Sequence, residues 1–162
     1  MTLYETDFHA WTRDQAAVLR RLATERANLP LDLALLAEEV EDMGNSEFFA
    51  VRSQVARIVE HLLKLEHSPA REPRGGWMDS VDDARLAIED RITASLRARL
   101  ADDLAKAYAT ARRKAERAMR AHGEASALPA ACPYAMESIL VAGWYPANRH
   151  GIREDGEAGS RD

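Results

Sequence analysis

The stretch 47-EFFAVRSQVARIVEHLLKLEH-67 decides the fold class of this chain. Its apolar side chains return every third or fourth residue, at Phe48, Val51, Val55, Ile58, Val59, Leu62 and Leu65. This spacing places a continuous apolar stripe along one side of an α-helix. We therefore expect an amphipathic helix over 47–67, ended by Ser68-Pro69, whose stripe must be covered by other helices.

The same period recurs on both sides of this stretch, and no alternating strand pattern competes with it. Helices are predicted over residues 7–25, 31–43, 77–96 and 99–121, and a short one from Pro133 to Ala142. Gly44 is interpreted as the residue that ends the second helix, because glycine is common just beyond a helix C-terminus. The expected fold class is all-α, a helical bundle of about five main helices plus a short C-terminal helix.

The length of 162 residues suits one domain. We expect a single helical domain over residues 1–146 and a disordered polar tail over 147–162, which is aperiodic and bears glycine. The lone cysteine excludes an internal disulfide and fits a reducing compartment. No basic leader or long apolar run is present, so we expect a cytoplasmic protein without membrane contact.

Acidic residues crowd the helix predicted over 31–43, at Glu38, Glu39, Glu41 and Asp42. Mutual repulsion makes such a cluster costly, and carboxylates at the rim of a cleft can bind a cation. His61 lies at the margin of the 47–67 stripe, with Lys64 beside it. One hypothesis is therefore a metal-binding or hydrolase-like protein, in which a bound divalent metal ion activates water.

In that hypothesis the candidate metal ligands are Glu38, Glu41, Asp42 and His61, and the candidate catalytic residues are Glu38, Glu41, His61 and Lys64. The usual helical metal signatures, Glu-x-x-His and His-x-x-x-His, are absent. His61 also lies about 25 Å along its helix from the link to 31–43, so a shared site requires this helix to bend back or another helix to intervene. Asp7, His9 and Arg85 from other helices are the candidates to complete it. The interpretation we favour is a solvated acidic face and a boundary histidine that makes one hydrogen bond.

Cys132 precedes Pro133 at a predicted helix start, where a thiol can have a lowered pKa and become nucleophilic or redox-sensitive. No motif pairs this thiol with a base. We favour the alternative, a small buried residue before a helix.

Basic residues follow one another along the helix predicted over 99–121, at Lys106, Arg112, Arg113, Lys114, Arg117 and Arg120. They form a candidate patch for an anionic partner such as a nucleic acid. The net charge of −5 argues against a dedicated nucleic-acid-binding domain. No aromatic residue is interleaved after Tyr108, as single-strand binding would need. A solvated helix face is the favoured interpretation.

Several strings occur together in an order that resembles the bacterial family catalogued as domain of unknown function 29. They are Tyr4-Glu5-Thr6-Asp7-Phe8 with Trp11, Leu36 to Gly44, His61-Leu62-Leu63-Lys64, Trp77 with Arg85, Ala107-Tyr108 with Ala111-Arg112, and Leu128-Pro129 with Cys132-Pro133-Tyr134. The resemblance covers residues 4–146 and implies a helical fold. The family carries no assigned activity, so no catalytic residue is transferred.

The resemblance does direct attention to particular positions, namely Glu38, Glu39, Glu41, His61, Lys64, Trp77 and Arg85. Leu65 stands where an aromatic residue is common in the family, which puts a stacking role there in doubt.

Three functional hypotheses follow, and the sequence does not decide whether the protein is an enzyme. The leading one is a non-enzymatic helical bundle that acts through protein contacts as a homodimer, because alanines line the helix over 99–121. The rival is the metal-dependent site described above. The third is nucleic-acid binding through the basic face of the 99–121 helix.

Overall fold

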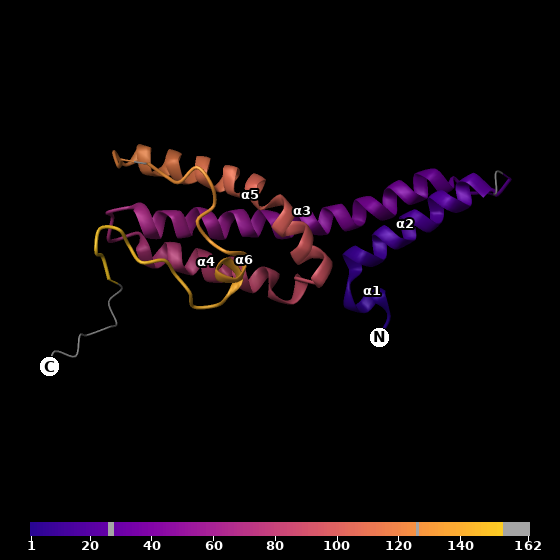
Figure 1. The fold of residues 1–162 in the computed structure, drawn as a ribbon, viewed down its shortest axis with the longest axis horizontal. Coiled ribbons are helices and arrows are strands. Elements are labelled where there is room, and N and C mark those ends of the chain that lie inside the picture. Colours follow the sequence, from indigo (N-terminus) through magenta and orange to yellow (C-terminus); the bar gives the residue numbers. More distant parts are fainter. Residues whose placement is uncertain (26–27, 126, 154–162) are drawn as a thin grey trace. The chain divides into compact units, whose positions relative to one another are not determined.

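The computed structural model describes residues 1–25, 28–125 and 127–153 (Figure 1). Its elements are α1 (Leu3–Thr6), α2 (Phe8–Glu25), α3 (Leu33–His67), α4 (Arg74–Ile88), the 3-10 turn η1 (Glu89–Arg91), α5 (Ala94–Ala121) and α6 (Met136–Leu140). No strand occurs in this part of the chain, which confirms the all-α prediction. None of the described helices is long and apolar enough to cross a membrane.

The helices predicted over 31–43 and 47–67 form one continuous helix, α3, so the predicted helix end at Gly44 is wrong. The reason is a close approach between helices. A Cβ atom at Gly44 would lie 2.0 Å from the Oγ1 of Thr12 on α2. Glycine in a helix interior costs about 1 kcal/mol relative to alanine. The packing of α2 against α3 therefore requires glycine at position 44. Because the two predicted helices are one, the described chain has four long helices where five main helices were expected.

The helix predicted from Trp77 to Leu96 ends early, at Ile88, and Leu96 belongs to α5. The first turn of α5 is held by side chains. The amide of Leu96 donates to Thr93 Oγ1 at 3.4 Å, and the amide of Ser95 donates to the Asp7 carboxylate at 3.0 Å. These oxygens satisfy amides that have no partner within the helix, so α5 begins here.

The described residues form two compact units. Unit 1 comprises Met1–Arg52 and Arg91–Asp102, and unit 2 comprises Ser53–Asp90 and the chain from Asp103 onward. The long helices α3 and α5 each contribute residues to both units. The expectation of one domain over residues 1–146 stays a prediction.

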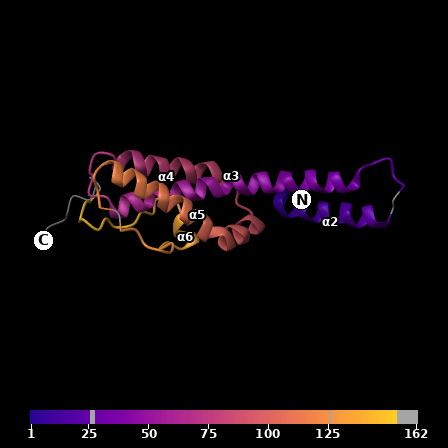
Figure 2. The ribbon, with the colours of Figure 1, turned by 90° about the horizontal axis from the view of Figure 1, so that it is seen from above.

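Unit 1 is built on a hairpin in which α2 lies along the first part of α3 (Figures 1 and 2). Its buried apolar side chains are Ala16, Leu33, Ala37, Phe48, Val51, Leu96 and Leu100. The small residues on the facing sides of α2 and α3 allow the two helices to approach closely.

Unit 2 packs α4 and the later part of α5 along the second part of α3 (Figures 1 and 2). Its core includes Val55, Ile58, Val59, Leu62, Leu63, Leu65, Val81, Ala84, Ile88, Tyr108, Met119 and Ile139. The alanines Ala107, Ala111 and Ala115 of α5 are buried here, at most 3% exposed. The alanine stripe that suggested a dimer contact therefore serves the core of unit 2.

Candidate functional site

A buried polar contact joins α2 and α3 where the two helices pack against each other. His9 is 1% exposed, and its Nδ1 lies 3.1 Å from the carbonyl oxygen of Gly44. A carbonyl can only accept, so Nδ1 carries the proton and leaves Nε2 to face Arg99 Nη1 at 3.5 Å. Burial, more than any other cause, lowers the pKa of His9. From the sequence, His9 was expected only as an auxiliary ligand, and its role between α2 and α3 was missed.

One broad side of the hairpin is mostly apolar, with Gln15 among its residues. An α-helix turns by about 100° per residue, so the direction of each side chain follows from the residues at which α2 and α3 contact each other. On this basis, one flank of α2 and one flank of α3 lie on the same side of the hairpin. We call these residues the hairpin apolar face: Trp11, Val18, Leu22, Leu36, Val40 and Met43. Val18 is 38%, Leu36 41% and Met43 54% exposed, and the other three are half-buried.

The opposite broad side of the hairpin is polar and holds part of the predicted acidic cluster. Glu41 forms an ion pair with Arg20 of α2 and lines a hollow with Arg13 and Asn45. Glu38, Glu39 and Asp42 are exposed along the same stretch of α3. The favoured interpretation, a solvated acidic face, describes these three side chains.

His61 belongs to unit 2, on the same helix as the acidic cluster but twenty residues beyond Glu41. A helix rises about 1.5 Å per residue, so side chains this far apart on one helix do not share an ion. Within the described ranges, no three His, Cys, Asp or Glu side chains are grouped so that they could hold a metal ion. The structure does not bring Glu38, Glu41, Asp42 and His61 together.

His61 and Lys64 do lie together. Lys64 is 7% exposed, and its Nζ donates to Glu60 Oε1 at 2.6 Å. Within the part of the chain that the structure describes, Nδ1 of His61 is buried without a hydrogen-bond partner, unlike the single hydrogen bond expected for this residue. Burial, followed by the positive charge of Lys64, lowers the pKa of His61 to about 4. His61 is therefore neutral at pH 7, beside a buried ion pair.

Lys64 and Trp77, another residue singled out from the sequence, lie at the same groove. Both line a groove of about 730 Å³ within unit 2, which we call the α3–α4–α5 groove. Its other lining residues are Ala70, Glu72, Pro73, Ala118, Met119, His122 and Glu124. This groove is where the structure assembles predicted residues from different helices.

Arg85 fastens the C-terminal segment to α4. It is 6% exposed and donates to the carbonyl oxygens of Ile139 at 3.0 Å, Ser138 at 3.1 Å and Trp144 at 2.9 Å. Tyr145 completes the attachment, because its hydroxyl donates to Asp82 at 2.7 Å. These contacts give Arg85 a structural role.

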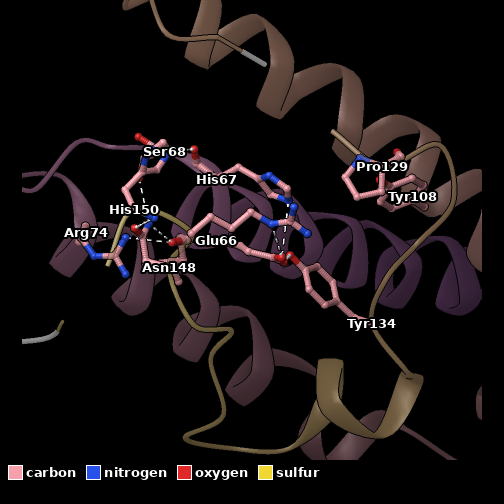
Figure 3. A network of polar contacts seen from close by, with 11 residues as sticks. Glu66, His67, Ser68, Arg74, Tyr108, Pro129, Tyr134, Asn148 and His150 are labelled. Atoms are coloured by element: carbon pink, nitrogen blue, oxygen red, sulfur yellow. Dashed lines mark hydrogen bonds and ion pairs between the residues drawn. The ribbon is translucent and has the colours of Figure 1, made fainter. Parts of the chain in front are cut away.

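A polar network attaches the segment after Pro146 to the end of α3 (Figure 3). Asn148 Nδ2 donates to the carbonyl oxygens of Leu65 at 2.8 Å and Ser68 at 2.9 Å. Glu66 accepts from Tyr134 at 2.7 Å and from Arg149 at 3.0 Å. Asn148 and Arg149, which belong to the predicted disordered tail, thus form hydrogen bonds with the end of α3 and with Ser68, while residues 154–162 lie outside the described chain.

Cys132 lies in the loop before α6, whose N-cap is Ala135, so the expected helix-start position of the thiol is wrong. Its Sγ lies 3.5 Å from the carbonyl oxygen of Tyr134. Burial raises the pKa of the Cys132 thiol, opposite to the shift that an activated nucleophile needs. The favoured interpretation is a small buried residue before a helix, and Cys132 is half-buried in the structure.

Two of the basic residues of α5 form ion pairs along the helix. Arg112 pairs with Glu116 at 2.8 Å, and Lys106 pairs with Asp103 at 3.0 Å. The exposed residues of the candidate basic patch are Lys106, Arg113, Lys114, Arg117 and Arg120. Nucleic-acid binding through this face stays a prediction.

Comparisons with known proteins identify the fold and the family without an activity. A crystal structure of an α-helical protein of unknown function from Rhodospirillum rubrum is similar, with 30% sequence identity and a TM-score of 0.75. The similarity covers 89% of this chain and 92% of that one. No curated protein matches the chain. The model of the family described as "Domain of unknown function DUF29" matches residues 3–145, and the chain belongs to this family.

Proposed function

We propose that this protein acts through protein contacts as a homodimer, in which the hairpin apolar face packs against the same face of a second copy. The observation that carries the proposal is the unequal character of the two sides of the hairpin. One side holds the ion pair of Arg20 with Glu41, whereas the other exposes Leu36 and Met43. The proposal includes the expected cytoplasmic location.

A two-helix hairpin covers only the narrow seam between its helices. Two hairpins stacked face to face make a four-helix bundle, which buries the broad apolar side of each. Twofold symmetry requires the same patch on both partners, and a face that is apolar on α2 and α3 together meets this requirement.

The size of the face also suits a second copy. The 18 residues of α2 span about 27 Å. With two helices side by side, the face is about 20 Å wide. This area is of the same order as the surface of about 800 Å² that each partner buries in a stable interface.

The test is the solution mass of matched variants. Met43→Lys places a charge in the proposed contact of both copies, and Leu86→Lys changes a residue of α4 that is 69% exposed and lies off the face. Each copy loses the contact of one Met43 side chain, which contributes about 1–1.5 kcal/mol to dimer formation. The dissociation constant of the Met43→Lys dimer should therefore rise about 100-fold.

Sedimentation equilibrium should give a dimer for the wild type and Leu86→Lys, and a shift toward monomer for Met43→Lys. Circular dichroism of all three proteins shows whether each is folded. A wild type that stays monomeric at every concentration refutes the proposal. Equal association of the two lysine variants would refute the assignment to this face.

A further inference from the structure

The α3–α4–α5 groove combines the features of a small-molecule site. Its volume of about 730 Å³ falls in the range of about 300–1,000 Å³ usual for ligand sites. Trp77, at the start of α4, lines the groove with an aromatic side chain, and Pro73, Ala118 and the buried Met119 line it with apolar ones. The lining residues all belong to unit 2, so the site is complete within one compact unit.

The charges in the groove favour a positive ligand. Its one lysine, Lys64, already donates to Glu60 at 2.6 Å, which neutralises the ammonium. Two carboxylates, Glu72 and Glu124, also line the groove. Oε2 of Glu124 is buried and has no hydrogen-bond partner among the described residues. A buried carboxylate oxygen without a donor is costly, so a ligand that donates a hydrogen bond here would be favoured.

We propose that the α3–α4–α5 groove binds a small organic cation, a primary amine with an apolar body. The ammonium group donates to Glu124, where a positive charge strengthens the hydrogen bond. Trp77 lines the same groove, and an aromatic ring attracts a positive charge through its quadrupole. The apolar body then lies against Met119 and Pro73. An organic anion would meet two carboxylates and a lysine that is already paired.

Three probes of nearly equal shape separate charge from hydrophobicity: benzylamine, benzyl alcohol and benzoate. Isothermal titration calorimetry on the full chain should detect benzylamine and give affinities at least about tenfold weaker for the other two. Two-dimensional NMR should place the largest benzylamine shifts at the indole of Trp77 and at Met119.

The variant Glu124→Gln keeps the shape of the side chain and removes its charge. It should weaken benzylamine binding at least about tenfold, because the charge-assisted hydrogen bond is lost. The control Glu89→Gln, an exposed carboxylate outside the groove, should bind as the wild type does.

Four results would overturn the proposal. They are the absence of benzylamine binding at millimolar concentration, benzoate binding as tight as that of benzylamine, NMR shifts that fall outside the groove, and unchanged affinity in a folded Glu124→Gln. None depends on the oligomeric state, so this proposal and the dimer proposal fail separately.

Discussion

Replacement of Gly44 by alanine should destabilise the protein even though alanine is the better helix former. The new Cβ would lie 2.0 Å from Thr12 Oγ1, 3.1 Å from Thr12 Cβ and 3.3 Å from His9 Nδ1. Thr12 is fully buried, and its hydroxyl donates to the carbonyl oxygen of His9 at 2.9 Å, so moving the hydroxyl breaks that bond.

Overpacking lowers the free energy of unfolding by about 1–3 kcal/mol, and the lost hydrogen bond lowers it by about 1 kcal/mol. The higher helix propensity of alanine raises it by about 1 kcal/mol. The expected loss in the free energy of unfolding is therefore about 1–3 kcal/mol, and the Tm should fall by about 2–4 °C for each kcal/mol. Urea denaturation followed by circular dichroism measures the loss.

Two comparisons sharpen this experiment. Gly76→Ala on α4 meets no atom within 4 Å, so it should leave the stability equal or higher. In a Thr12→Ala background the clash with Oγ1 is gone, and Gly44→Ala should cost less than about 0.5 kcal/mol. A Gly44→Ala protein as stable as the wild type, or an equal loss in both backgrounds, would refute the close approach of α2 and α3.

Three further predictions concern titration, attachment and thiol reactivity. The pKa of His61 is about 4 in the folded protein and about 6.5 in the unfolded chain. The contribution of neutral His61 to the free energy of unfolding is therefore fully present above pH 6.5 and is lost as the pH falls through 4. The loss should be about 1–2 kcal/mol after allowance for solvent screening, and His61→Gln should flatten the acid limb of stability against pH; parallel curves would contradict this. Arg85→Met should lower the free energy of unfolding by about 3 kcal/mol and speed amide hydrogen exchange over residues 138–145. The control Asp83→Asn should change neither. Unchanged exchange in Arg85→Met would show that the attachment of the C-terminal segment does not depend on Arg85. Since burial raises the pKa of Cys132, iodoacetamide at pH 7 should alkylate it more slowly than a cysteine in an unstructured peptide, and faster alkylation would contradict the proposed burial.

The helical class and many helix ends could be predicted because amphipathic periodicity is a local property. The stripe from Phe48 to Leu65 depends only on neighbours three and four residues away. Gly44 could not be interpreted correctly, since the atom that requires glycine there belongs to Thr12 on another helix. The attachment of Asn148 to Leu65 likewise joins residues more than eighty positions apart.

In the candidate sites too, single conspicuous residues could be predicted from the sequence, but which residues lie together could not. The acidic cluster and His61 are conspicuous in the sequence, yet their spacing on one helix keeps them apart. Trp77 was singled out by the family resemblance, and Lys64 also by its place beside His61. Both line one groove because α3 and α4 pack against each other. The unpartnered oxygen of Glu124 has no signal in the sequence, because burial of one atom depends on the packed structure.

The most direct measurement of the proposed dimer is an isotope-filtered NOE experiment on a mixture of labelled and unlabelled chains. Met43 is a suitable reporter, because its side chain is 54% exposed on the hairpin apolar face. We expect intermolecular cross-peaks from the Met43 methyl group and none from the buried methyl groups of Met119 and Met136. Intermolecular cross-peaks that avoid Met43, or a sample with none at all, would contradict the pairing of hairpins.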